Sequence, residues 1–379
     1  MKSDRRKTNL IICNSYPTDK NPTAQVFIKN IKEQLESQGI NSYVYYNKII
    51  DIWPNATNFK SLSANIIKYT VFILGLIPLC FRIHQFRTIN PHGIIISGFV
   101  GAIFKKLFKK KLIIHIHGGD VNQYSSKNSI YKFLYYFTLK YSDIVISNSN
   151  DITTKLNRIR SIEKKIVKIY PGVDKKLFRK YDINKRRLIK QKYNIPKNQI
   201  VFLFIGNAIR RKGLDLFFNA LCKLTNREIN KAHIVICSEG PKLKETKNKI
   251  TKNPRLKNIF TFIKKVNQNK LPEIYALGDI FVFPSLEEPL GLVGIEALAC
   301  GLPVIGSRIG GINDYLINNS NGLFFEPENV TQLSEIISNL INNPQIISNL
   351  KLNTNKNLNK FFSNYTAVQL KNIFLMHEK

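Results

Sequence analysis

The most constraining feature of this sequence is a series of short apolar runs, each followed by a loop and a stretch with helical spacing. One series begins at residues 9–13 (NLIIC), and a second begins at residues 200–205 (IVFLFI). Short runs that are apolar on both faces are typical of strands in a parallel sheet, because crossover helices cover both sides of such a sheet. The pattern predicts an α/β chain in which each series builds one parallel sheet.

Residues 178–199 separate the two series and are polar, strongly basic and without strand pattern. We interpret this segment as a linker between two Rossmann-like domains, since 379 residues suffice for two domains of ordinary size. The expected boundaries are residues 1–178 for the first domain and 179–359 for the second. Residues 365–374 have the spacing of a last amphipathic helix.

Composition narrows the class of protein. The five cysteines are scattered through mostly apolar runs without Cys-x-x-Cys or Cys/His spacing, so neither disulfides nor structural zinc is expected. The N-terminus lacks the apolar core of a secretory signal, and the longest apolar run, residues 71–81, is too short to span a bilayer. These features favour a protein of the reducing cytoplasm.

The chain is strongly basic, with a formal net charge of +33. Residues 1–190 hold 34 of the 58 basic residues and 11 of the 25 acidic ones, so most of the excess lies in the first half. Three explanations compete: the composition of an AT-rich genome, attraction to an anionic membrane surface, and nucleic-acid binding. No helix-turn-helix, zinc-finger or RNP pattern supports the third, and nucleic acid is not an expected partner.

Two stretches of the first half could lie on a membrane surface. Residues 66–81 are apolar with basic residues behind them, which fits either a core helix or a helix that dips into a bilayer. In residues 104–111 (FKKLFKKK), Phe104, Leu107 and Phe108 share one helical face among five lysines. Solvent and anionic lipid are equally compatible with this second stretch.

Residues 285–311 (SLEEPLGLVGIEALACGLPVIGSRIGG) carry the clearest chemistry. Pro289 and Gly291 disfavour helix, so Glu288 is expected in a loop and Glu296 inside the helix predicted for residues 292–299. The backbone N–H groups at this helix start form a seat for an anion, and they belong to Leu290, Gly291, Leu292 and Val293. Carboxylates on either side can accept hydroxyl hydrogens. A nucleotide sugar presents both groups, a diphosphate and hydroxyls.

A second loop is expected to hold an anion. After the strand at residues 200–205 come Gly206 and Asn207, and then three adjacent cations, Arg210, Arg211 and Lys212, before the next helix. Cations at a helix start are unfavourable unless an anion is bound there, so this loop is predicted to contact the diphosphate.

These motifs resemble the retaining glycosyltransferases of family 4, which have the GT-B fold. The resemblance rests on Glu-x7-Glu from Glu288 to Glu296, the following ALACGLPVI and the Gly-Gly at 310–311. His117-Gly118-Gly119-Asp120 is similar to the family's His-Gly-x-Asp, and Glu239-Gly240-Pro241 to its nucleotide-side loop. Lys212-Gly213 also fits the family pattern. Asn207 stands where the family has arginine, and either Arg210 or Arg211 can supply that charge. Residues 22–25 replace a Gly-Gly usual in the first loop.

The resemblance implies roles for these residues. Glu296 would bind the ribose hydroxyls, Glu288 would lie near the donor sugar, and His117, with Asp120, would contact the sugar side of an inter-domain cleft. Arg211 and Lys212, with the helix-start amides, would neutralise the leaving diphosphate of a UDP- or GDP-linked sugar. No metal is expected in such enzymes. Relatives retain anomeric configuration, and their last helix, here about residues 360–379, packs back on the first domain.

We therefore expect a glycosyltransferase that acts on a glycan or lipid-linked acceptor in bacterial surface polysaccharide assembly, such as lipopolysaccharide, O-antigen or capsule. It would be cytoplasmic or peripheral on the inner face of the membrane. The alternatives are a soluble sucrose- or glycogen-type transferase, a nucleotide-sugar epimerase, and an idle GT-B protein that binds lipid or nucleic acid. Both glutamates and Lys212 are present, which argues against the idle protein.

Overall fold

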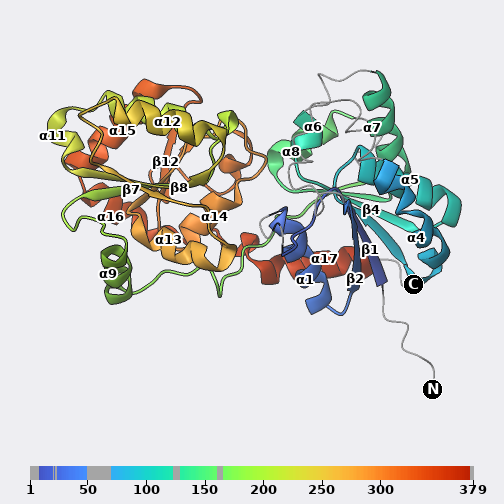
Figure 1. Ribbon diagram of the computed structural model, residues 1–379. Coiled ribbons are helices and arrows are strands. Elements are labelled where there is room, and N and C mark those ends of the chain that lie inside the picture. The colour runs from blue at the N-terminus through green and yellow to red at the C-terminus, as the bar shows by residue number, and fades with distance from the viewer. Residues whose placement is uncertain are drawn as a thin grey trace. The chain divides into compact units, whose positions relative to one another are not determined.

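The computed structural model describes residues 8–19, 21, 24–48, 70–122, 129–159 and 165–375. The chain divides into two compact units (Figure 1). Unit 1 comprises Met1–Gly172 and Ser363–Lys379, and unit 2 comprises Val173–Phe362. The chain therefore passes from one unit to the other twice.

Unit 1 is built on a six-stranded parallel sheet with the order β2-β1-β3-β4-β5-β6. Its strands are β1 (Thr8–Cys13), β2 (Asn41–Tyr46), β3 (Thr88–Pro91), β4 (Lys111–Ile116), β5 (Ile144–Ser147) and β6 (Ile166–Lys168). Successive side chains of β1 enter different cores, with Leu10 and Ile12 in one and Ile11 and Cys13 in another. A strand buried on both faces explains why its sequence reads as a continuous apolar run.

Helices cover both faces of this sheet. They are α1 (Val26–Ser37), α4 (Ile77–Arg82), α5 (Ile96–Phe108), α6 (Gly119–Asn122), α7 (Ser129–Tyr141), α8 (Asn150–Asn157) and α17 (Ser363–Leu375). The last helix, α17, packs against α1, where Leu35 and Leu370 share a core. The Thr366 hydroxyl donates a hydrogen bond of 2.9 Å to the carbonyl of Tyr170.

Unit 2 repeats this plan with a six-stranded parallel sheet of order β12-β11-β10-β7-β8-β9. Its strands are β7 (Ile200–Asn207), β8 (Ala232–Glu239), β9 (Phe260–Ile263), β10 (Ile280–Phe283), β11 (Val304–Ser307) and β12 (Gly322–Phe325). Its helices are α9 (Ile183–Lys192), α10 (Leu214–Cys222), α11 (Asn226–Ile229), α12 (Pro241–Thr251), α13 (Leu271–Leu277), α14 (Leu292–Ala299), α15 (Val330–Asn342) and α16 (Gln345–Leu352).

One core of unit 2 lies between its sheet and the helices α10 and α15, where Phe202, Phe217 and Leu333 are fully buried. Helices α12 and α15 cover one face of the sheet, and α13 and α14 cover the opposite face (Figure 1). The prediction of two parallel α/β sheets is confirmed for both units.

Two stretches differ from the sequence-based expectations. Residues 178–199, expected as a linker, belong to unit 2 and contain α9. In residues 104–111, α5 ends at Phe108. Phe104 is buried in the core and Phe108 packs against it, whereas Leu107, on the same helix, is 66 % exposed. Lys111 already begins β4.

Other expectations lie wholly or partly outside the described residues. These include positions 22 and 23 of the first loop and positions 66–69 of the apolar stretch. Among the helices that are described, none is long and apolar enough to cross a membrane.

Candidate functional site

The candidate site of unit 2 begins where strands β7 and β10, which are neighbours in the sheet, both end. The crossovers from these two strands leave in opposite directions, and ligands of open α/β sheets bind at such a switch point. The loop after β7 touches the loop after β10, since the Leu286 amide donates a hydrogen bond of 2.8 Å to the Arg211 carbonyl. A Cβ at Gly213 would lie 1.8 Å from the Pro284 oxygen, so only glycine permits this approach.

An ion pair joins the two loops through two of the predicted site residues. The Lys212 ammonium pairs with the Glu288 carboxylate, and the two side chains are only 15 % and 9 % exposed. The ammonium also lies 5.3 Å from the centre of the Phe283 ring. This arrangement places one fixed cation and one fixed carboxylate beside the start of α14.

The start of α14 has the form that the sequence predicts, and its bounds match residues 292–299. Gly291 caps the helix with a left-handed φ of 85°, where a side chain would be strained and would also meet the Phe283 ring. Leu290, just before the cap, is buried. Leu292 and Val293 form the first turn, where backbone amides have no partner within the helix.

Glu296 lies one turn inside α14 and is buried. The Tyr275 hydroxyl of α13 lies 2.8 Å from its Oε2 and donates a hydrogen bond to it. Burial raises the pKa of Glu296 to about 7, although the hydrogen bond from Tyr275 opposes this rise. A carboxylate that changes charge near neutral pH is therefore held rigidly on the flank of the helix.

The loop that follows β7 is called the cationic loop below, and it contains a short 3-10 helix, η5 (Arg210–Lys212). Arg210 and Arg211 are both exposed, so neither is singled out as the replacement for the family arginine. Asn207 is exposed at the end of β7. Gly206, next to it, has φ 153°, and no atom lies within 4 Å of the place where its Cβ would be. A ligand can therefore approach this backbone closely.

Glu239 ends β8, and its backbone carbonyl accepts a hydrogen bond of 2.6 Å from the amide of Ala208 in the cationic loop. Its exposed carboxylate pairs with Lys265 at 2.6 Å. The contact to the cationic loop is thus made by the Glu239 backbone.

The remaining predicted residues belong to unit 1. His117 directly follows β4, and its Nε2 lies 2.9 Å from Nδ1 of His92. Burial lowers the pKa of His117 to about 3, so its imidazole is neutral at physiological pH. Asp120 falls in α6, and its side chain lies outside the described part of the structure.

Three histidines of unit 1 gather at this point. Nitrogen atoms of His92, His115 and His117 lie within 4.8 Å of one another, and within the described ranges no other group of three His, Cys, Asp or Glu has spacing that suits a metal ion. Nε2 of His115 is buried without a hydrogen-bond partner. Sequence reasoning identified His117 but not the other two.

Tyr275, which holds Glu296, was also missed. It precedes Glu296 by about twenty residues on another helix, and no local motif connects the two. The same applies to Asp279, which pairs with Arg186 of α9 at 2.7 Å and with Lys190 and Lys351 at 3.1 Å each. Burial opposes ionisation of this carboxyl, but the three cations outweigh burial and hold the pKa of Asp279 below its usual range.

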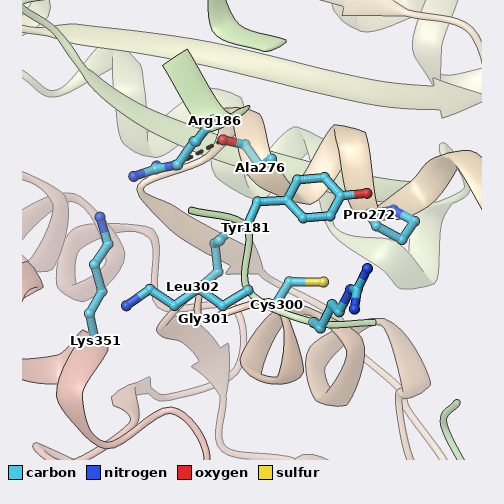
Figure 2. Close-up of a pocket in the computed structure, with 10 residues that line it drawn as sticks. Tyr181, Arg186, Pro272, Ala276, Cys300, Gly301, Leu302 and Lys351 are labelled. Carbon is cyan, nitrogen blue, oxygen red and sulfur yellow. Dashed lines mark hydrogen bonds between the residues drawn. The ribbon is translucent and has the colours of Figure 1, made fainter. Parts of the chain in front are cut away.

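Arg186 also anchors α9 to the end of α13. Its Nε donates a hydrogen bond of 2.9 Å to the Ala276 carbonyl, at one side of a small cavity that Lys351 and Cys300 also line (Figure 2). The ion pairs around Asp279 thus fasten the segment that the sequence suggested as a linker.

Solved structures show the class of fold. Anabaena HepE in complex with UDP is 18 % identical with a TM-score of 0.76, over 97 % of this chain and 99 % of that one. A sucrose-phosphate synthase of Thermosynechococcus elongatus is 19 % identical with a TM-score of 0.81, over 97 % and 98 %. WaaG, a glycosyltransferase of lipopolysaccharide biosynthesis, is 14 % identical with a TM-score of 0.72, over 97 % and 100 %. The fold is GT-B.

Family comparisons specify the class. The model "Glycosyltransferase Family 4" matches residues 24–177, and "Glycosyl transferases group 1" matches residues 185–360. The chain belongs to glycosyltransferase family 4.

Several curated relatives align with only part of this chain. N-acetyl-alpha-D-glucosaminyl L-malate synthase of Bacillus anthracis is 25 % identical over 63 % of this chain and 61 % of its own length, which is less than two thirds. An uncharacterized glycosyltransferase of Methanocaldococcus jannaschii is 27 % identical over 84 % and 82 %. A GDP-mannose-dependent phosphatidylinositol monomannoside mannosyltransferase of Mycobacterium tuberculosis is 30 % identical over 45 % of both chains.

Proposed function

We propose that this chain transfers a sugar from a UDP- or GDP-linked donor to a glycan or lipid-linked acceptor during assembly of a bacterial surface polysaccharide. The observation that carries the proposal is the paired Lys212 and Glu288 beside the start of α14, with Glu296 held on the helix flank by Tyr275. Cations and helix-start amides suit a diphosphate, and fixed carboxylates suit hydroxyl groups. Both groups occur in a nucleotide sugar.

Each residue then has a separate task. Glu296 binds the ribose hydroxyls, and Glu288 orients a hydroxyl of the transferred sugar. Lys212, with Arg210 or Arg211, stabilises the negative charge that grows on the diphosphate as the glycosidic bond breaks. Preorganised groups of this kind contribute about 3–4 kcal/mol each to transition-state stabilisation.

We further propose that transfer proceeds with retention and needs no metal, since Lys212 and the neighbouring arginines supply positive charge for the diphosphate. The departing phosphate would take the proton of the acceptor hydroxyl. Measurement of the product anomer and of activity with a metal chelator tests both statements. An inverted product, or loss of activity that Mg²⁺ restores, would refute them.

A panel of nucleotide sugars in thermal shift names the donor, and transfer assays with that donor test the roles. Glu288→Gln and Glu296→Gln should each abolish turnover while the chain stays folded. Glu287→Gln is the matched control, because Glu287 is the exposed neighbour of Glu288 and should keep full activity. Retained activity in Glu296→Gln would remove the proposed site.

The proposed lipid-linked acceptor rests on the surface of unit 1. Helices α4, α5 and α7 lie on the same side of its sheet (Figure 1). They carry exposed apolar side chains, with Phe81 at 78 %, Leu107 at 66 % and Ile130 at 68 % exposure. Exposed basic residues accompany them, namely Arg82, Lys106, Lys109, Lys132 and Lys140. Apolar and cationic side chains together match an anionic bilayer at the inner face of the cytoplasmic membrane.

Sedimentation with vesicles of anionic lipid tests this part. Binding is expected at low salt, with a decrease at high salt and in the variants Phe81→Glu and Leu107→Glu. Leu352→Glu is the control, since Leu352 is an exposed apolar residue of unit 2. Absence of binding at low salt, together with efficient transfer to a soluble sugar, would favour a sucrose- or glycogen-type transferase instead.

A further inference from the structure

A row of hydrogen bonds in unit 1 runs from a buried amide to His117. The Nδ2 group of Asn90 donates to the Ile113 carbonyl at 2.7 Å, and the Asn90 Oδ1 lies 3.3 Å from Nε2 of His92. Nδ1 of His92 lies 2.9 Å from Nε2 of His117. Asn90 and His92 are buried, which shields the row from competing water.

The backbone carbonyl of Ile113 determines which atoms carry hydrogens. A carbonyl can only accept, so the Asn90 amide must present its NH₂ there and its oxygen to His92. His92 must then carry its hydrogen on Nε2. Burial and the neighbouring histidines lower the pKa of His92 well below its usual value, so the ring is neutral and its Nδ1 has only a lone pair.

His117 is therefore the donor of the next hydrogen bond, through Nε2–H. The two rings are inclined by only 18° with centroids 5.1 Å apart, which is the spacing of two imidazoles joined edge to edge by an in-line hydrogen bond. Since neutral imidazole carries one hydrogen, Nδ1 of His117 has a lone pair.

We propose that Asn90 and His92 are positioning residues that fix His117 as the Nε2–H tautomer, so that its Nδ1 accepts a hydrogen bond from a hydroxyl group of the donor sugar. The inference rests on the proposed function and on the sugar contact that the family resemblance implies for His117; what it adds is the tautomer of that ring and the two residues that fix it. A neutral acceptor nitrogen suits a hydroxyl, whereas it would repel an oxygen of a phosphate or carboxylate.

A metal ion is the competing use of this cluster, because His115 adds a third imidazole. A tetrahedral zinc ion with nitrogen ligands at about 2.0–2.1 Å would hold those nitrogens about 3.3 Å apart. The 2.9 Å separation of His92 and His117 suits a shared hydrogen better. The rings of His92 and His115 are also stacked, at 4.6 Å and 28°, rather than directed at a common point.

The first test uses the full chain labelled with ¹⁵N in its six histidines. Long-range ¹H–¹⁵N spectra distinguish a protonated ring nitrogen from one with a lone pair. We expect His117 to be protonated at Nε2 alone from pH 5 to pH 8, with no change on addition of ZnCl₂. A protonated Nδ1, or a shift of the His92 and His117 signals by zinc, would overturn the proposal. This measurement needs neither a variant nor activity, so it stands even if the proposed function fails.

The second test uses variants of His92. In His92→Phe the ring shape is kept but the acceptor is lost, so the His117 tautomer should become mixed, whereas His92→Gln offers an amide oxygen and should restore it. The matched control is His233→Phe, which removes another buried histidine with one 2.9 Å hydrogen bond, to Thr261.

Transfer assays complete this test. We expect kcat/KM for the nucleotide sugar to fall about 3- to 10-fold in His92→Phe, as for loss of one neutral hydrogen bond. Affinity for the nucleoside diphosphate alone should be unchanged, because only the sugar contacts His117. An equal loss of affinity for the diphosphate, or an unaltered tautomer in His92→Phe, would contradict the assigned role.

Discussion

Substitution of Tyr275 by phenylalanine removes one hydroxyl from the core of unit 2 and tests the role of Glu296 directly. The hydroxyl donates to the Glu296 carboxylate at 2.8 Å and lowers the pKa of that group, which burial raises to about 7. A hydrogen bond to a charged group contributes about 1.5–3 kcal/mol, and about 1.4 kcal/mol corresponds to one pKa unit. In Tyr275→Phe the pKa of Glu296 should therefore rise by about one to two units.

The consequence is a shifted pH dependence of nucleotide affinity. Ribose hydroxyls donate, so they need the ionised carboxylate, and affinity should rise with pH through about 7 in the wild-type protein and then level off. At pH 7.5 the variant should bind roughly 3- to 25-fold more weakly, while at pH values well above the raised pKa the two proteins should converge.

Calorimetric titration of UDP or GDP from pH 6 to pH 9.5 measures this shift. Glu296→Gln is the control, since it removes the carboxyl and leaves only the titration of the nucleotide's terminal phosphate, with a second pKa of about 6, as the baseline for the other two proteins. The reasoning fails if Tyr275→Phe keeps the wild-type midpoint, or if its affinity is reduced equally at every pH.

Four further predictions concern stability and catalysis. Gly213→Ala should lower the free energy of unfolding by about 2 kcal/mol or more, because its Cβ would meet a carbonyl at 1.8 Å; Gly39→Ala has similar φ but open space, and a smaller loss there in denaturant titration isolates the contact. Asp279→Asn leaves three partly buried cations without their carboxylate, so it should lower the free energy of unfolding by about 3–5 kcal/mol in the same titration. A loss below about 1 kcal/mol would show that these ion pairs contribute little to stability. Lys212→Met should reduce kcat about 10²- to 10³-fold with the fold intact by circular dichroism, and a change in KM alone would refute its transition-state role. The pKa of Glu296 is higher in the folded chain than in the unfolded chain, so the folded chain binds the extra proton and wild-type stability falls as the pH rises from about 4.5 to 7. The melting temperature of Glu296→Gln should therefore increase relative to that of the wild type over the same pH range. A constant difference would contradict the raised pKa.

The parallel sheets could be predicted from their central strands, such as residues 200–205, which are apolar and almost fully buried, whereas the edge strands β2 and β6 are only partly buried and carry a weaker signal. The helix from Leu292 to Ala299 was also predictable, since Gly291 before it and Gly301 after it are local signals that act within a few residues. Such signals do not depend on the rest of the chain.

Contacts between distant segments could not be predicted in this way. Tyr275 reaches Glu296 from another helix, and His92, which Asn90 of the neighbouring strand β3 contacts, reaches His117. Helical spacing also left the environment of Leu107 undecided, because periodicity shows that side chains share a face but not whether that face packs against the core. Only the packing of α5 decides that question.

The return of α17 to unit 1 has a consequence for the order in which the chain can fold. Leu370 of α17 packs in one core with Leu35 of α1, so unit 1 needs two segments that are synthesised far apart in time. Unit 2, by contrast, is one uninterrupted segment and can fold before α17 has left the ribosome. During translation α1 must therefore wait for α17, which is made after the whole of unit 2, with part of its apolar surface uncovered. We expect chaperone binding to nascent chains to persist until α17 emerges, and selective ribosome profiling would detect this delay.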